Sequence, residues 1–465
     1  MSPGDGHDPG GVMGKSLHLA LIALLAIVIA AGLAGPLAAS APARAGHGVF
    51  VWKKSLDPTP TYDDLSLCAR GPGATVYACG GRGWPSAIDI WLVKRSAAGA
   101  PGWSHLWDGP DGLADNAEGM VVDGAGNVYV CGTTQRTGGD TDSVVLKYDA
   151  SGTLKWQTIY DPEGLTDGAR AIGLDAAGDV YVAGWSATSG SGNDVYTAKF
   201  RSAGGTRVWT SWYSGPQYDD ASGIAVTSGG VCYTIGVSNP VNGKADALLV
   251  KTTATGAQAW AKRWNGPKDR NDEWNSVALS RSGSVCVAGT TNALGAADIV
   301  AARYSSAGKR LWLRTWGSRG GQKDYAKDLA VARDGSAWVA GMTDRGEGDM
   351  RTALVKWSSS GKLRFARAMG SRKTSADLSS VIVDAHGDAF VAGNMITAGS
   401  GGWKLLAAKY APSGKLGWRS LAAHNSGSDD LLYDMVFGGP GFLYGCGVVG
   451  STGADSRGVL VKIRR

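Results

Sequence analysis

The sequence predicts an all-β fold, a single eight-bladed β-propeller of four-stranded antiparallel blades. One repeat of about 52 residues recurs along the chain, as expected of a propeller or solenoid. The composition also suits short strands joined by turns, because the chain holds 71 Gly and only four of its acidic residues are Glu. A closing aromatic marks the end of each copy: Trp52, Trp103, Trp156, Trp209, Trp260, Trp312, Phe365 and Trp418.

Each repeat contains four strand-like stretches. In one clear copy these are Gly119–Val122, Asn127–Cys131, Ser143–Tyr148 and Leu154–Tyr160. Tight turns rich in Asp and Gly connect the first pair and the last pair, which predicts two hairpins per unit. Consecutive apolar residues within the stretches indicate sheets that are packed on both faces.

The order of the stretches predicts how the ring closes. The first fourth-strand pattern is Val49–Ser55, and the last third-strand pattern is Val459–Ile463. We therefore expect the N-terminal strand to complete the C-terminal blade, which would protect both strand edges.

The recurring segments GNVYVCG, GDVYVAG, GSVCVAG and GDAFVAG, followed by units such as LKYDASGTLKW, resemble SBBP repeats. This family of β-propeller repeats reads G-N-V-Y-V-A-G and then V-V-K-Y-D-x-x-G-x-x-x-W. The resemblance covers nearly the whole chain after its N-terminal segment. It implies an exported or surface protein and assigns no ligand.

The N-terminal segment is typical of an export signal. Lys15 precedes an apolar run, 17–34, and Ala43-Arg44-Ala45 forms a small-residue cleavage pattern. We expect residues 1–45 to be a signal peptide, residues 46–465 to be the propeller, and the protein to be secreted or on the cell surface. An uncleaved membrane anchor is the alternative. The net charge of +6 lies in no basic run, so the sequence predicts no nucleic-acid partner.

Six cysteines lie within strand patterns, namely Cys68, Cys79, Cys131, Cys232, Cys286 and Cys446. In strands, cysteine often serves as a small apolar residue. A disulfide between Cys68 and Cys79 across one hairpin is the alternative.

Strand order predicts two unlike faces. The connections from strand two to three and from strand four to the next blade leave one face, the long-loop face, with expected loops such as Thr133–Thr141, Ser186–Asn193 and Met342–Met350. Short turns leave the opposite face, the short-turn face. Because long loops on a rigid scaffold commonly bind ligands, we expect the long-loop face to be the working face. The aromatic residues there that fall outside the repeat pattern are candidate contacts for a protein or glycan: Trp84, Trp185, Tyr218 and Trp403.

An aspartate recurs just before the first strand in seven copies: Asp63, Asp115, Asp167, Asp219, Asp272, Asp324 and Asp430. The seventh copy has Ala376 instead. A collar of carboxylates suits a hard cation such as Ca²⁺. The interpretation we favour is that each Asp caps its own turn, because one metal site needs only one or two copies. We expect no other cofactor.

A basic residue recurs near the end of every third strand: Lys94, Lys147, Lys199, Lys251, Arg303, Lys356, Lys409 and Lys462. We expect each to pair with a nearby carboxylate rather than to bind an acidic polymer. Aromatic residues four apart, such as Trp103 with Trp107 and Trp156 with Tyr160, share one face of a strand and predict packing between blades.

The sequence favours a non-catalytic binding or scaffold module acting on a protein or glycan. It contains no H-E-x-x-H and no G-x-S-x-G motif. Asp149–Trp156 resembles the tryptophan-docking motif of eight-bladed quinone dehydrogenases, but this chain lacks their vicinal cysteines. The alternatives are an enzyme centred on the channel, either a hydrolase or a quinone-dependent oxidoreductase, and a purely structural surface protein.

Overall fold

The computed structural model describes residues 48–56, 62–84, 87–190, 192–239, 244–292, 296–318, 321–346, 349–397, 399, 401–423, 427–451 and 456–465. The predicted signal segment, 1–45, lies outside the described residues. No helix among the described residues is long and apolar enough to cross a membrane.

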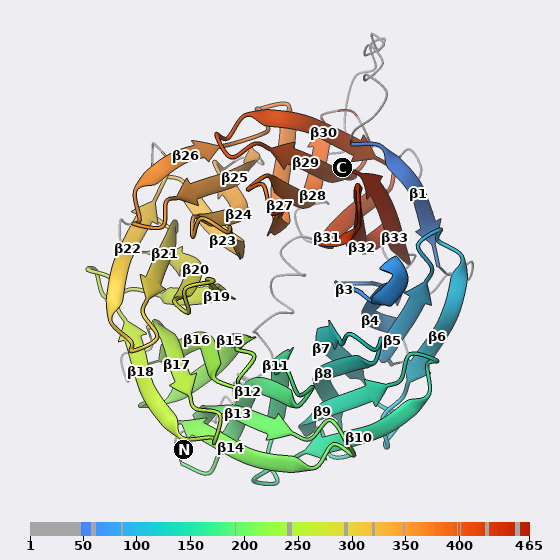
Figure 1. Ribbon diagram of the computed structural model, residues 1–465, viewed down its shortest axis with the longest axis vertical. Coiled ribbons are helices and arrows are strands. Elements are labelled where there is room, and N and C mark those ends of the chain that lie inside the picture. The colour runs from blue at the N-terminus through green and yellow to red at the C-terminus, as the bar shows by residue number, and fades with distance from the viewer. Residues whose placement is uncertain are drawn as a thin grey trace, which may run out of the picture. The chain divides into compact units, whose positions relative to one another are not determined.

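Eight antiparallel sheets form the ring, which confirms the predicted eight-bladed propeller (Figure 1). Blade 1 comprises β2(Tyr62–Asp63), β3(Leu67–Arg70), β4(Val76–Trp84), β5(Asp89–Arg95) and β6(Pro101–Trp107), and blade 2 comprises β7(Asp115–Val122), β8(Val128–Gln135), β9(Thr141–Tyr148) and β10(Leu154–Tyr160). Blade 3 comprises β11(Asp167–Leu174), β12(Val180–Thr188), β13(Gly192–Phe200) and β14(Arg207–Tyr213), and blade 4 comprises β15(Tyr218–Val226), β16(Cys232–Asn239), β17(Asp246–Thr252) and β18(Gln258–Trp264). Blade 5 comprises β19(Asp272–Leu279), β20(Val285–Thr291), β21(Asp298–Tyr304) and β22(Arg310–Trp316), and blade 6 comprises β23(Lys323–Val331), β24(Ala337–Asp344), β25(Met350–Trp357) and β26(Leu363–Arg367). Blade 7 comprises β27(Thr374–Val383), β28(Ala389–Thr397), β29(Lys404–Tyr410) and β30(Leu416–Ala422), and blade 8 comprises β31(Asp429–Gly439), β32(Phe442–Ser451), β33(Arg457–Arg464) and β1(Phe50–Ser55).

The first strand of each blade lies innermost, and the fourth lies at the rim (Figure 1). The inner strand shifts register against its neighbour near its middle, for example between Ala117 and Gly119. In blade 1 the same region splits the inner strand into β2 and β3, which both pair with β4. The second and third strands are almost wholly buried, because blades pack on both of their faces.

Several of the short turns are fixed by aspartate side chains, and others by serine or threonine hydroxyls. Asp123 Oδ1, between β7 and β8, accepts hydrogen bonds of 2.9 Å from the N–H groups of Ala125 and Asn127. Asp175 and Asp384 accept equivalent bonds in their own turns. These carboxylates replace main-chain partners that a tight turn cannot supply, which explains the excess of Asp over Glu.

The two ends of the described chain meet in blade 8. Strand β1 pairs antiparallel with β33, with Lys53 opposite Val461 and Ser55 opposite Val459. The predicted closure of the ring by the N-terminal strand is therefore confirmed.

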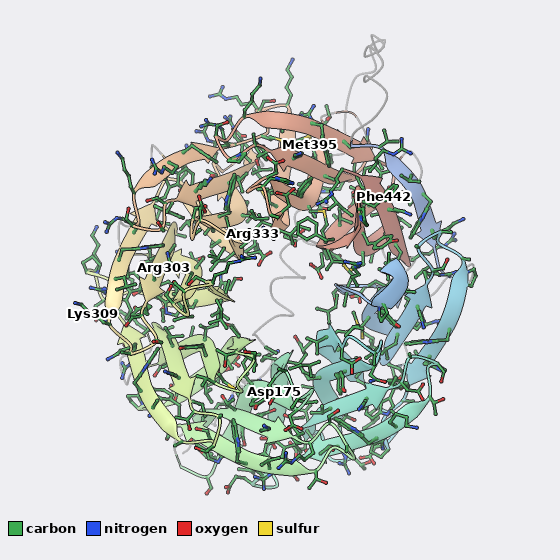
Figure 2. All side chains as sticks on the ribbon, in the orientation of Figure 1. Asp175, Arg303, Lys309, Arg333, Met395 and Phe442 are labelled. Atoms are coloured by element: carbon green, nitrogen blue, oxygen red, sulfur yellow. The ribbon has the colours of Figure 1, made fainter. Side chains whose placement is uncertain are left out.

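At seven of the eight junctions the closing aromatic of one blade packs on the turn between the third and fourth strands of the next, and at the eighth Trp418 packs on Gly48, which precedes β1. Trp312 Nε1 donates to Ser359 O at 3.0 Å, and Arg303, which Figure 2 labels on the ring, donates to the same carbonyl at 3.1 Å. A Cβ atom on Gly361 of this turn would lie 2.6 Å from the Trp312 ring. The predicted packing of these aromatics between blades is confirmed, and glycine is required where the ring touches the turn.

The prediction that each recurring basic residue pairs with a nearby carboxylate is wrong in most blades. Only Lys199 and Lys409 form ion pairs among the described residues, with Asp179 at 3.0 Å and Asp388 at 2.7 Å. The others reach a main-chain carbonyl of the next blade, as Lys94 does with Ala150 O at 2.6 Å. The long side chain spans the junction, so its partner lies about one repeat further along the chain.

The alternative disulfide between Cys68 and Cys79 does not form. In the pairing of β3 with β4, Cys79 lies opposite Leu67 and Cys68 lies opposite Ala78. A one-residue offset places the two thiols on opposite faces of the sheet. All six cysteines are buried free thiols, as expected of small apolar residues.

Candidate functional site on the long-loop face

The loops of the long-loop face are shorter than the sequence predicted. The two ends of the expected loop Thr133–Thr141 are strand, because β8 and β9 stay paired as far as Gln135 and Thr141, which leaves residues 136–140 as the connection. The longest connections on this face run instead from the fourth strand to the next blade, for example residues 108–114 and 265–271. The longest connections of this face therefore lie at the junctions between blades.

The seven recurring aspartates lie inside these junctions and not on an open collar. Each side chain is at most 1% exposed. Asp115, Asp219 and Asp272 each accept a hydrogen bond from a glycine N–H in the preceding loop, at 2.6 Å for Gly109 and Gly266. Capping of the local turn is thus present in these copies.

The main chain at the same position connects neighbouring blades. The Asp115 N–H donates to Ile88 O at 2.6 Å, and the Asp324 N–H donates to Ala297 O at 2.7 Å. Both acceptors immediately precede the third strand of the previous blade. The recurring Asp therefore lies beside the start of that third strand, where another Asp stands in five blades: Asp89, Asp142, Asp194, Asp246 and Asp298.

Burial changes the protonation of two ring aspartates most clearly. Burial raises the pKa of Asp167 to about 8, and the nearby carboxylates of Asp161 and Asp142 add to the effect. The pKa of Asp115 is raised to about 6, mainly by burial, with contributions from Asp89 and Asp108. These two positions have the chemistry expected of groups that hold a proton or a cation.

The four candidate aromatics are not brought together. Trp84, Trp185, Tyr218 and Trp403 belong to blades 1, 3, 4 and 7. The Nε1 atom of Trp185 is buried, and its ring covers Gly168 on the neighbouring strand. Trp403 is half-buried and bonds Asp429 through its main-chain N–H at 2.9 Å. Among the three candidates whose side chains the structure describes, Trp185, Tyr218 and Trp403, only Tyr218 is well exposed, at 38%.

The long-loop face carries a basic pocket that the sequence prediction missed. It has a volume of about 360 Å³ and lies between blades 5 and 6. Its lining includes Trp316, Arg345 and Arg351, from the ends of β22, β24 and the start of β25. Arg351 forms two hydrogen bonds of 3.0 Å with Asp349, whose pKa is lowered mainly by Arg351 and also by Arg345 and Arg372.

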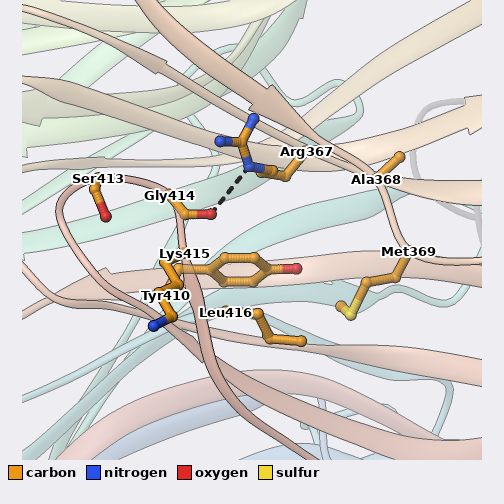
Figure 3. A pocket seen from close by; sticks show the side chains of 8 residues that line it. All are labelled: Arg367, Ala368, Met369, Tyr410, Ser413, Gly414, Lys415 and Leu416. Atoms are coloured by element: carbon orange, nitrogen blue, oxygen red, sulfur yellow. Dashed lines mark hydrogen bonds between the residues drawn. The ribbon is translucent and has the colours of Figure 1, made fainter.

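A second pocket, of about 470 Å³, lies between blades 6 and 7 (Figure 3). Strand β26 is short, and Met369 stands where other fourth strands carry their second aromatic. Figure 3 shows Tyr410 between Arg367 and Met369, with Arg367 Nε bonded to Gly414 O at 3.0 Å. Because the turn that contains Gly414 belongs to the short-turn face, this pocket is not part of the predicted working face.

Charged side chains on the inner strands neutralise one another across blades. Arg170 lies 3.3 Å from Glu118 and 3.5 Å from Asp220, which belong to the blades on either side. Lys327 has a similar place between Glu273 and Asp377, and burial lowers its pKa. Asp328 accepts bonds from Ser276 Oγ at 3.0 Å and from the Val381 N–H at 2.8 Å, so one carboxylate links three blades.

The fold and these junctions define an eight-bladed β-propeller with inter-blade sites. No protein-family model matches the chain. The regulatory protein FlaEY of Caulobacter vibrioides is 29% identical over 232 residues, which make up 43% of this chain and 22% of that protein. The chain therefore matches about a fifth of the length of that relative.

Among solved structures, Sqt1 from Chaetomium thermophilum is similar, with a TM-score of 0.54 and 12% identity over 90% of this chain and 100% of that one. A polysaccharide lyase of the PL25 family, an ulvan lyase, has a TM-score of 0.49 and 10% identity over 89% of this chain and 94% of its own. At 12% identity the likeness to Sqt1 shows the fold alone.

Proposed function

We propose that the chain is an exported, non-catalytic binding or scaffold propeller that acts through its long-loop face on a protein or glycan. Its repeated G-N-V-Y-V-C-G and Y-D-A-S-G-x-x-x-W segments support membership of the SBBP-type repeats. The single observation that carries the binding role is the pocket lined by Trp316, Arg345 and Arg351.

The chemistry of this pocket favours an anionic ligand. A half-buried tryptophan offers a flat apolar surface against which a sugar ring can stack. Arginine pairs with carboxylate or sulfate groups through two parallel hydrogen bonds. Arg345 is exposed, so its guanidinium group is accessible to a partner. An acidic glycan or an acidic protein segment fits this combination best.

The inner strands support binding over catalysis. Arg170 is held between Glu118 and Asp220, so both of these carboxylates are ion-paired and not free to act as a general base. The two histidines in the described part of the chain are His105, on the outer strand β6, and His386, in the β27–β28 turn. Neither lies on an inner strand. The channel-centred enzyme and the purely structural protein remain the alternative functions.

The test is a binding screen of the purified chain against arrays of acidic and neutral glycans and of cell-envelope proteins. We expect an acidic ligand, with binding reduced at least tenfold by Trp316→Ala and by Arg345→Ala. Arg281→Ala, which removes an exposed arginine on the short-turn face, is the matched control and leaves binding unchanged.

The same screen separates the aromatic candidates. Loss of binding on Trp185→Ala or Trp403→Ala, with Trp316→Ala unaffected, would move the site to another part of the long-loop face. Absence of any ligand that depends on one of these residues would refute a binding role for this face. Sequencing the N-terminus of the secreted protein tests export and cleavage after Ala45.

A further inference from the structure

Two neighbouring blade junctions each gather three carboxylates. Asp89, Asp108 and Asp115 meet between blades 1 and 2, and Asp142, Asp161 and Asp167 meet between blades 2 and 3. In both, one Asp begins the third strand, one directly follows the fourth strand, and one begins the inner strand of the next blade. The repeat has thus built the same cluster twice.

The spacing of the oxygens suits one cation in each cluster. One carboxylate oxygen from each residue lies within 4.8 Å of the other two. Two oxygens that bind one Ca²⁺ at roughly 2.4 Å can be no more than about 4.8 Å apart. The clusters therefore have the dimensions of a calcium-sized site.

The most buried carboxylate of each cluster has unused bonding capacity. Neither oxygen of Asp167 has a donor of normal hydrogen-bond geometry in the described part of the chain, although the nearby Ser186 hydroxyl partly offsets the rise in its pKa; the side chain is 0% exposed. Asp115 is equally buried; its Oδ2 accepts from the Gly109 N–H, while its Oδ1 lacks a donor of normal geometry among the described residues, although the nearby Thr134 hydroxyl partly offsets the rise in its pKa. Buried carboxylate oxygens in this condition are costly, unless a proton or a cation satisfies them.

Two other junctions supply protein donors at this place, whereas Oδ1 of Asp219 and Oδ1 of Asp272 lack a donor of normal geometry among the described residues, as Asp115 Oδ1 does. Between blades 5 and 6, Asp324 accepts from the Ser318 N–H and from Thr343 Oγ1, both at 2.6 Å. Between blades 4 and 5, Arg263 Nε binds Asp246 at 3.1 Å. The position that follows the fourth strand is Ser214, Asn265 or Gly317 in these junctions, where Asp108 and Asp161 stand in the other two.

One basic group faces the second cluster. Arg136 Nη1 lies 2.7 Å from Asp142 Oδ2, and its Nε lies 3.0 Å from Asp111. Asp140 adds a further negative charge near Asp142 and Asp167. The single guanidinium leaves Asp142 Oδ1 buried and without a donor within the described residues, so negative charge remains in excess.

We infer that each cluster is a binding site for a divalent, oxygen-preferring cation of the size of Ca²⁺. Asp89, Asp108 and Asp115 supply one site, and Asp142, Asp161 and Asp167 supply the other. Each cation links two blades on the long-loop face and takes the place that Thr343 and Arg263 fill in two other junctions. Asp108 and Asp161 are the residues that distinguish these junctions from the rest of the ring.

The test uses the full chain after removal of divalent ions, titrated with Ca²⁺ by calorimetry and with Tb³⁺ by sensitised luminescence. Trp107 and Tyr160 directly precede Asp108 and Asp161, so each site has its own aromatic donor for luminescence. The variants are Asp108→Asn and Asp161→Asn, which change exposed side chains and leave the buried packing intact. Asp269→Asn is the matched control, because Asp269 is exposed on the same face in an equivalent loop.

We expect two equivalents of Ca²⁺ to bind the wild-type chain and one equivalent to bind each single variant. Asp108→Asn removes the luminescence sensitised by tryptophan, and Asp161→Asn removes that sensitised by tyrosine. The control variant keeps both sites. Absence of calcium binding to the wild type, or equal binding by the control and the two cluster variants, would overturn the inference, because only diffuse attraction to surface acids would then remain.

Discussion

The contact between an aromatic ring and a turn glycine at a blade junction can be measured by a pair of matched substitutions. Gly361 and Gly283 both end a Ser-x-Ser-Gly turn, with φ of +80° and +76°. Each N–H bonds the carbonyl of the first serine, at 2.9 and 3.0 Å. The two turns differ in their surroundings, because a Cβ on Gly283 meets nothing within 4 Å, whereas one on Gly361 meets Trp312 at 2.6 Å.

The magnitude follows from this difference. Alanine at a positive φ costs about 1 kcal/mol in either turn, because its Cβ crowds the backbone. At Gly361 the same atom also forces the Trp312 ring to move, and such overpacking typically costs about 1–3 kcal/mol more. We therefore expect Gly283→Ala to lower the free energy of unfolding by about 1 kcal/mol and Gly361→Ala by about 2–4 kcal/mol.

Urea unfolding followed by tryptophan fluorescence provides the measurement, with the denaturant slope compared among variants to confirm that the same unit unfolds. A double variant with Trp312→Leu should recover part of the loss at Gly361 and none of the loss at Gly283. Equal destabilisation by the two glycine substitutions would refute the role assigned to the ring–turn contact.

Three further predictions concern closure, pH and the thiols. Trp52→Ala should destabilise the ring by about 2–4 kcal/mol in thermal unfolding, because the Trp52 ring packs on Gly99 of the next blade; an unchanged melting temperature would contradict closure through β1. In chelator, stability should fall as pH rises from about 4 to 8, since Asp115 and Asp167 bind protons more tightly in the folded state, with pKa near 6 and 8, than when unfolded. Melting curves across this pH range measure the direction of the change in stability, and added Ca²⁺ should reduce the loss. A stability that rises with pH would contradict the prediction. All six thiols should resist alkylation in the native protein and react once it is unfolded without reductant, as counted by mass spectrometry; fewer than six labels would reveal a disulfide.

The repeat made the architecture predictable from sequence. Because every blade repeats the same strand pattern and ends in a closing aromatic, eight imperfect copies together specify strand order and closure, even where blade 1 divides its inner strand. The loops were predicted less well, because the strands beside Gln135 and Thr141 continue pairing through residues whose composition is typical of a turn.

The sites were less predictable because they form between repeats. Lys94 and its acceptor Ala150 are 56 residues apart, and a search for a nearby carboxylate does not find such a partner. Aligning the copies located the ring aspartates but gave no weight to Asp108 and Asp161, whose column differs from blade to blade. The signal was present as an acid directly after the fourth-strand aromatic in these two copies. Trp316, by contrast, follows the repeat pattern, so nothing in its own sequence marked it as part of a pocket.

The composite eighth blade determines the order in which the ring can be completed. Contacts at the other junctions join residues about one repeat apart, for example 47 residues for Trp312 and Ser359, whereas Lys462 reaches Ala97 across 365 residues. As the chain grows, each new sheet can pack on the preceding one, while β1 stays unpaired until β33 is present. The entropy of joining distant ends is lost in that final step alone, and it grows only slowly with length. The blades can therefore assemble through contacts between neighbouring repeats until the last step. In that step, pairing of β1 with β33 converts an open row of sheets into a closed ring without free sheet edges at its ends.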